Sequence, residues 1–81
     1  MKEKLKPFSK KAKALKSREY EHYRGNRYKV LGVARHSETL EELVVYQALY
    51  GEHGIWVRPL GMFLEKVKVN GKTVSRFRYI E

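Results

Sequence analysis

The sequence predicts an all-β domain that follows a basic N-terminal arm. From Tyr20 onward, short runs in which apolar and polar residues alternate are separated by turn residues, a pattern typical of strands. One tryptophan, six tyrosines and three phenylalanines among 81 residues favour a packed core over a low-complexity chain. This length allows one domain at most, and it excludes a cleft between two lobes.

Charge divides the chain near Ser17. The formal net charge is +9, from 18 basic and 9 acidic residues. Residues 1–18 hold eight basic residues and one glutamate, a net charge of +7, whereas residues 19–81 hold ten basic and eight acidic residues, a net charge of +2. We therefore assign residues 1–18 to a flexible or nascent-helical basic arm and residues 19–81 to the β domain.

The arm has a weak helical pattern. Leu5, Phe8, Ala12 and Leu15 recur at spacings of three and four, which places them on one face if Pro7 opens a helix. Because so short a helix is marginal in water, we expect disorder or fraying unless Phe8 and Leu15 pack on the body or on a partner. Three roles are compatible with the composition of the arm: a tail that improves solubility, a segment that binds nucleic acid, and a segment that binds an anionic membrane surface. Its candidate phosphate ligands are Lys10, Lys11, Lys13, Lys16 and Arg18.

The sequence of the first half of the β domain predicts one strand and one hairpin. Tyr28 to Ala34 alternates as a strand, and Gly32 in its middle predicts a bulge or a sharp bend. Thr39 to Tyr50 could start as a capped helix, but the β-branched and aromatic run from Leu43 to Tyr46 favours a strand. We choose a hairpin, in which a loop with two glycines leads to a second strand, Ile55 to Arg58.

The second half predicts a helical turn and another hairpin. The spacing of the apolar residues between Leu60 and Leu64, which include Phe63, predicts one helical turn that plugs an end of the sheet. Two alternating runs, Glu65 to Val69 and Lys72 to Tyr79, flank an Asn-Gly turn. Together these elements predict a small, strongly bent SH3-like barrel of about five strands with a one-turn helix, and an OB-type barrel is the alternative.

The order of several uncommon sequence words resembles the bacterial domain-of-unknown-function family 1653. These words are Tyr20–Gly25, Tyr28–Thr39, Leu43–Tyr46, Leu49–Gly51, Trp56–Pro59, Met62–Phe63 and Arg76–Phe77. The resemblance covers about residues 20–80 and implies an SH3-like small domain of bacteria and their phages, with no established activity. The sequence departs from the family's pattern at Ser75, where we expect proline. The basic arm lies outside the region of resemblance.

One loop carries residue types that are used in catalysis. His36, Ser37, Glu38 and Thr39 combine a base, two hydroxyls and a carboxylate. Neighbours in an extended segment point to opposite faces, so these groups need not converge, and catalysis is the weakest interpretation. A polar turn whose hydroxyls bond nearby backbone, or a loop that contacts a ligand, fits the same residues.

Metal and cofactor chemistry is not expected. The sequence contains no cysteine, which excludes disulfides, thiolate chemistry and Cys-based zinc sites. Its histidines, His22, His36 and His53, are far apart and show no metal-ligand spacing.

Trp56 and Arg58 form a second candidate site. A single tryptophan in so small a domain usually belongs to the core. If Trp56 instead faces outward with Tyr23, Tyr46 or Tyr50, these rings form a surface on which a base or a cationic group can stack. The guanidinium of Arg58 would then hold a phosphate or a carboxylate.

The last strands offer a third patch. Arg76 and Arg78 are two residues apart and share a face of a strand, as do Lys66 and Lys68. With Lys72 they could form a basic stripe that binds phosphates. Lysines on edge strands also serve to prevent aggregation, which is the alternative interpretation.

These features favour a non-enzymatic binding module for nucleic acid or a nucleotide. The aromatic and arginine face would supply stacking, and the arm would supply phosphate affinity. The alternatives are a module that docks on a partner enzyme, and a small hydrolase that uses the loop from His36 to Thr39. We expect a cytoplasmic protein with no integral membrane association, because no apolar run is long enough for a membrane span or a signal peptide.

Overall fold

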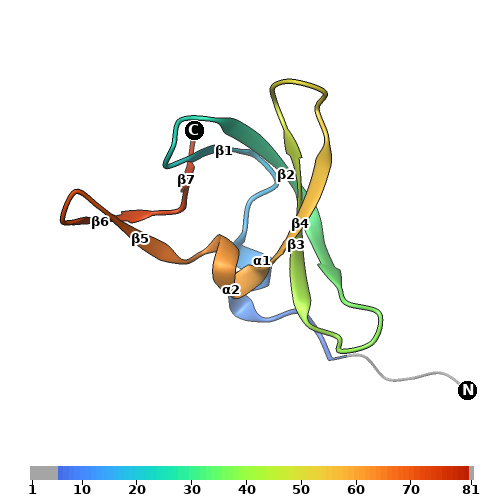
Figure 1. Cartoon of the computed structure of the whole chain (residues 1–81). Coiled ribbons are helices and arrows are strands. Elements are labelled where there is room, and N and C mark those ends of the chain that lie inside the picture. Colours follow the sequence, from blue (N-terminus) through green and yellow to red (C-terminus); the bar gives the residue numbers. More distant parts are fainter. Residues whose placement is uncertain (1–5, 81) are drawn as a thin grey trace, which may run out of the picture.

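The structure, a computed structural model, describes residues 6–80, which form two short helices and seven strands (Figure 1). In chain order the elements are α1 (Lys10–Ala14), β1 (Glu19–His22), β2 (Arg27–Arg35), β3 (Glu42–Ala48), β4 (Ile55–Pro59), α2 (Leu60–Phe63), β5 (Lys66–Val69), β6 (Lys72–Ser75) and β7 (Phe77–Tyr79). Leu5, which we expected on the apolar face of the arm, lies outside the described residues. Neither described helix has the length or the apolar composition that a membrane span requires.

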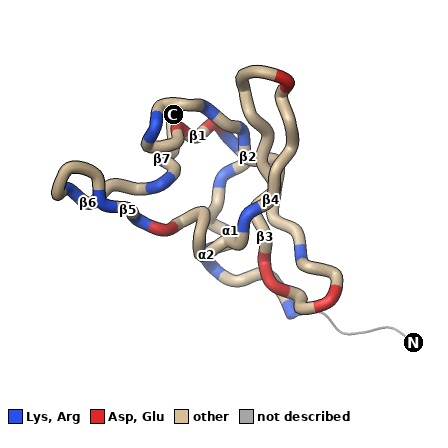
Figure 2. The backbone as a smooth tube through the Cα atoms, viewed as in Figure 1, with Lys and Arg blue, Asp and Glu red and all other residues tan. Residues whose placement is uncertain are grey.

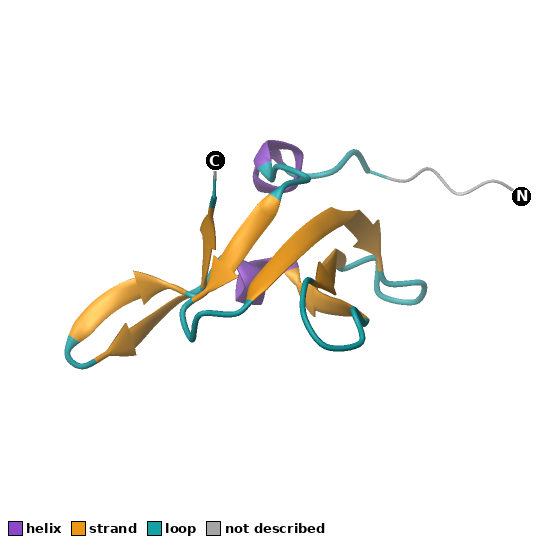
Figure 3. Cartoon of the chain, turned by 90° about the horizontal axis from the view of Figure 1, so that it is seen from above, coloured by secondary structure: helices purple, strands orange, loops and turns teal. Residues whose placement is uncertain are grey.

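The strands form two antiparallel sheets, which confirms the prediction of a mostly β domain. The large sheet has the order β4-β3-β2-β1-β7, and β5 pairs with β6 in a separate hairpin. Figure 3 shows this hairpin projecting from the rest of the domain. Because β4 and β7 are the two edges of the large sheet, the described residues do not close into the predicted barrel.

The bulge predicted at Gly32 is present in β2. Val30 pairs with Tyr46 and Gly32 pairs with Val45, so one extra residue lies between these two pairs. A bulge shifts the alternation of side chains by one residue. As a result both Val30 and Val33 pack against the core, although three positions separate them.

The predicted β3–β4 hairpin and the helical turn are also confirmed. Ala48 N donates to Gly54 O at 2.9 Å and closes the hairpin loop. In α2, Leu60 and Phe63 are buried as predicted. Leu64 is 40% exposed, so the prediction that it belongs to the plug is wrong: it is the C-cap residue that follows the last turn of α2.

The prediction of one long returning strand from Lys72 to Tyr79 is wrong. β6 ends at Ser75, and β7 crosses to the large sheet, where Phe77 pairs with His22 and Tyr79 with Tyr20. Phe77 is buried there, whereas no residue of β5 or β6 is fully buried. Burial of an aromatic ring in the core thus outweighs continuation of the hairpin.

The core is centred on two stacked rings. Phe63 of α2 and Phe77 of β7 are parallel, with ring centroids 4.2 Å apart and 7° between their planes. Tyr20 and Tyr46 pack against Phe63 at 5.4 and 5.6 Å. The aromatic residues that favoured a folded chain therefore join α2 to β1, β3 and β7.

The arm packs on this body through its apolar residues. Phe8 and Leu15 contact the core and Ala12 is buried within it, which is the condition under which we expected an ordered helix. The helix does not begin at Pro7 as predicted, because Ser9 is its N-cap and accepts a hydrogen bond from Ala12 N at 3.2 Å.

A carboxylate from β3 fixes the start of α1. Both the backbone N–H and the hydroxyl of Ser9 donate to Glu42 at 2.7 Å. These two hydrogen bonds lower the pKa of Glu42 below its ordinary value of 4.5. Glu42 therefore ties the arm to the sheet as a carboxylate.

We expect Phe63→Ala to lower the free energy of unfolding by about 3–5 kcal/mol, because it removes a fully buried ring and leaves a cavity beside Phe77. Urea denaturation followed by far-UV circular dichroism measures this loss. The control is Met62→Ala, which truncates an exposed neighbour and should change the free energy of unfolding by about 0.5 kcal/mol or less. Equal losses in the two variants would contradict this description of the core.

Glu42→Gln should remove a pH-dependent part of the stability. A carboxyl group whose pKa is lowered by folding stabilises the folded state above its unfolded pKa, near 4.5, and loses that contribution as the pH falls through the folded pKa. The free energies of unfolding of the natural protein and of Glu42→Gln should therefore converge in acid. Glu52→Gln leaves the contacts of Ser9 in place, and a convergence of the same size in this control would refute the assignment to Glu42.

Candidate aromatic and arginine site

Aromatic rings and one guanidinium gather on the face of the large sheet that also carries the core. Tyr46 lies directly opposite Trp56 across β3 and β4, and Arg58 follows on the same face two residues later. The ring of Tyr28 packs edge-on against Tyr46 at 5.4 Å, and the ring of Tyr50 packs edge-on against Tyr28 at 5.5 Å. We call these five residues the aromatic face.

The aromatic face has a buried base and an exposed rim. Tyr46 is 5% exposed, whereas Tyr50 and Trp56 are 44% and 58% exposed. The interpretation of Trp56 as a core residue is therefore wrong. Trp56 lies on an edge strand, which has a neighbour on one side only and leaves the indole in solvent.

The tyrosine hydroxyls of the aromatic face take part in two separate hydrogen bonds. Arg58 Nε donates to the Tyr46 hydroxyl at 3.4 Å, and the hydroxyls of Tyr28 and Tyr50 are 2.6 Å apart. The pKa of Tyr28 is raised to about 12, mainly because the hydroxyl is partly buried and also because it is hydrogen-bonded to Tyr50. Tyr28 is therefore a hydroxyl that stays protonated even in moderately alkaline solution, and it keeps its hydrogen bond with Tyr50 there.

Positive charge surrounds His22 at the adjoining end of β1. Burial lowers the pKa of His22, and the charges of Arg76, Arg58 and Arg24 lower it further. His22 Nδ1 accepts a hydrogen bond from Arg24 N at 3.2 Å, so the neutral ring carries its proton on Nε2. An uncharged N–H donor therefore lies in a region that attracts anions.

A groove of about 510 Å³ continues from His22 toward the projecting hairpin. His22 and Tyr23 line it from β1 and the turn that follows, and Val69 and Val74 line it from β5 and β6. The rings of His22 and Tyr23 lie 4.5 Å apart. The ring of His22 also packs edge-on against Tyr28 at 6.4 Å, so Tyr23, proposed from the sequence as a ligand contact, is linked to the aromatic face through His22.

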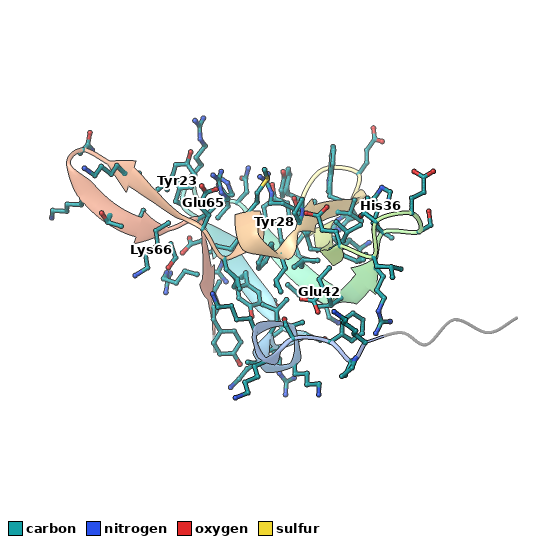
Figure 4. All side chains as sticks on the ribbon, turned by 90° about the horizontal axis from the view of Figure 1, so that it is seen from below. Tyr23, Tyr28, His36, Glu42, Glu65 and Lys66 are labelled. Atoms are coloured by element: carbon teal, nitrogen blue, oxygen red, sulfur yellow. The ribbon has the colours of Figure 1, made fainter. Side chains whose placement is uncertain are left out.

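The loop from His36 to Thr39 lies elsewhere. Figure 4 shows His36 far from Tyr23, with Tyr28 between them. His36 Nδ1 accepts hydrogen bonds from Glu38 N at 3.1 Å and Thr39 N at 3.3 Å, and Thr39 Oγ1 accepts one from Glu41 N at 3.2 Å. These hydrogen bonds form a polar turn, which was one of the interpretations of this loop from the sequence. The hydroxyl of Thr39 accepts a hydrogen bond as expected, but the other two go to the imidazole of His36 and not to Ser37.

The basic residues singled out in the sequence are spread over several surfaces (Figure 2). Lys10, Lys11 and Lys13 are exposed on α1, Arg18 is exposed before β1, and the Lys16 ammonium lies 5.0 Å from the centre of the Tyr79 ring. Arg76 forms an ion pair with Glu65 at 2.9 Å, and Arg78 forms one with Glu21. Arg76 directly follows β6, and its backbone N–H donates to Glu65 O at 3.0 Å beside the start of β5, whereas Arg78 lies in β7.

Sequence reasoning missed three residues of this site. His22 was considered only as a metal ligand, Arg24 only as part of a turn, and Tyr28 only as a strand residue. The alternation of Tyr28 with Val30 indicates a shared face, but the pairing of β2 with β3 is needed to bring Tyr28 to Tyr46. For His22 and Arg24 the local sequence offers no comparable signal.

Comparisons with known proteins point to one family. The profile of a family described as Protein of unknown function (DUF1653) matches residues 18–79. The crystal structure of a DUF1653 protein from Bordetella bronchiseptica is similar with a TM-score of 0.79 and 35% sequence identity, over 85% of this chain and 91% of that chain. No curated protein matches the chain. The resemblance noted in the sequence is thus confirmed, and the chain belongs to the DUF1653 family.

Proposed function

We propose that the chain is a non-enzymatic module that binds a nucleotide or a single-stranded nucleic acid on the aromatic face. The observation that carries this proposal is that the exposed rings of Trp56 and Tyr50 lie on the same face of the sheet as the guanidinium of Arg58. Exposed aromatic rings that share a surface with an arginine are the combination that single-strand binding surfaces use for a base and its phosphate. The bent sheet with its bulge at Gly32 also fits the SH3-like class, which we keep as part of the proposal.

The exposed rings suit stacking with a base. Both faces of a base are π surfaces, so stacking on Trp56 or Tyr50 needs no particular base sequence. The Tyr28 hydroxyl holds the Tyr50 hydroxyl at 2.6 Å, which limits the rotation of the Tyr50 ring. A ring that is already positioned loses less conformational entropy when a ligand binds.

The phosphate would be held by Arg58 together with the groups around His22. Arg58 bonds Tyr46 through Nε, which leaves its terminal nitrogens for an anion. Arg24 and the Nε2–H of His22 add donors nearby. Arg76 and Arg78 each face a carboxylate, so we expect them to add less affinity than their charge suggests.

The arm would add affinity that depends on salt. The lysines of α1 are exposed on a helix that packs against the core, so their charges are carried on the same body as the aromatic face. Contacts between lysines and phosphates release counterions and weaken steeply as the salt concentration rises. We therefore assign the lysines a nonspecific role and the aromatic face the ligand-contacting role.

The geometry of the His36 loop supports binding over hydrolysis. His36 Nδ1 accepts hydrogen bonds from two backbone N–H groups, and His36 follows the end of β2 whereas Tyr28 lies near its start. A general base must be aligned with the hydroxyl that it activates. The bonds of His36 instead stabilise the turn.

We expect Arg58→Gln to weaken binding of a short single-stranded oligonucleotide by about tenfold at moderate salt, because one charge-assisted contact is lost. Quenching of the fluorescence of Trp56, the single tryptophan, measures the affinity directly. Tyr50→Ala should cause a loss of about fivefold or more through lost stacking.

The matched control is Arg27→Gln, which removes an equal charge from an exposed position of β2 opposite Glu21. We expect a loss of less than about twofold that disappears at high salt. If Arg58→Gln and Arg27→Gln weaken binding equally, and salt abolishes both effects, the chain is only a polycation and the proposed site is refuted.

A further inference from the structure

β4 is an edge strand with large apolar side chains on both faces. Ile55, Trp56 and Val57 are each more than half exposed, although they pair with β3. Natural proteins usually protect such an edge with charged residues, with proline or with a covering element. Here Pro59 ends the strand, and the three residues before Arg58 carry no charge.

The outer edge of β4 presents backbone groups for another strand. Ala48 N donates to Gly54 O at 2.9 Å, so Ala48 and Gly54 form a hydrogen-bonded pair. Hydrogen-bonded and non-hydrogen-bonded pairs alternate in an antiparallel ladder. Trp56 therefore directs its backbone groups toward β3, whereas Ile55 and Val57 direct theirs outward.

Charge identifies the kind of partner that fits this edge. The chain has a net charge of +9, but the segment 49–59 holds one glutamate, Glu52, and one arginine, Arg58, and is formally neutral. Two copies of so basic a chain repel each other least where the local charge cancels. The opposite signs also lie at opposite ends of the segment, so a second copy running antiparallel would place each Arg58 toward the other copy's Glu52.

We propose that a second copy of this chain pairs with β4 across a two-fold axis, with Trp56 opposite Trp56 of the second copy. In this register Ile55 of each copy exchanges backbone hydrogen bonds with Val57 of the other, and Pro59 lies outside the ladder. The two indoles occupy a non-hydrogen-bonded pair, where opposed side chains approach most closely and aromatic pairs stabilise a sheet.

The position of the indole agrees with this register. Trp56 Nε1 lies 3.5 Å from the position that a Cβ on Gly54 would occupy, so the ring leans over the glycine. Arg58 of the second copy would lie opposite Gly54, on the same face as the ring. A side chain at Gly54 would fill this space.

The interface that results is small. A stable protein interface buries about 1,200–2,000 Å², and β4 has 5 residues. We therefore expect a dimer that dissociates on dilution. In this dimer the two aromatic faces lie on the same side of one continuous sheet. The proposed pairing of β4 does not depend on the proposed binding of nucleic acid.

Analytical ultracentrifugation of the full chain without ligand tests the dimer. We expect the sedimentation coefficient to rise with concentration, and Val57→Pro to abolish the rise because it removes an outward N–H that β3 does not use. Val57→Thr is the matched control, since it keeps the N–H and the branched shape and should still associate. A natural chain that stays monomeric at all concentrations, or an association that Val57→Pro leaves intact, overturns the proposal.

Cysteine cross-linking tests the register, and the absence of native cysteine makes the result unambiguous. Trp56→Cys should form a disulfide-linked dimer under mild oxidation, because the Cα atoms of a non-hydrogen-bonded pair lie about 4.5 Å apart. Ile55→Cys should cross-link at least tenfold more slowly, because its opposite residue is Val57 of the second copy. Faster cross-linking through Ile55→Cys than through Trp56→Cys overturns the proposed pairing.

Discussion

The stack of Phe63 on Phe77 is the contact on which the remaining structure depends. A five-stranded sheet must cover one apolar face, and the described chain has only two short helices with which to cover it. Phe63 brings α2 onto the sheet, and Phe77 brings the last strand beside the first. Tyr20 and Tyr46 complete the cluster from β1 and β3, so one group of rings fixes elements that lie far apart in the sequence.

Elements defined by neighbouring residues could be predicted from the sequence. The β-branched run of β3, the glycine bend in β2 and the apolar spacing of α2 each depend on short-range rules, and all three are present. The partner of β7 could not be predicted, since Phe77 leaves a well-formed hairpin for a distant strand. The order of α1 depends in the same way on a carboxylate 33 positions from Ser9.

The candidate site shows where pattern reasoning fails. Alternation along a strand indicates which residues share a face, but not which strand is an edge, so the exposure of Trp56 could not be derived. Charge counting places Arg76 and Arg78 in a binding surface, yet each pairs with a carboxylate on another element. The cluster around His22 depends on contacts among β1, β4 and the segment before β7.

The pairing of β7 with β1 also determines when the domain can be completed during synthesis. Glu21 and Arg78 face each other across 57 positions of sequence, so the outer edge of β1 has no partner until the ribosome has released residues 77–79. Contacts between distant segments require closure of a long loop, and such closure slows folding. In the nascent chain β1 is exposed, so the emergence of β7 sets the moment at which this edge is protected from neighbouring chains.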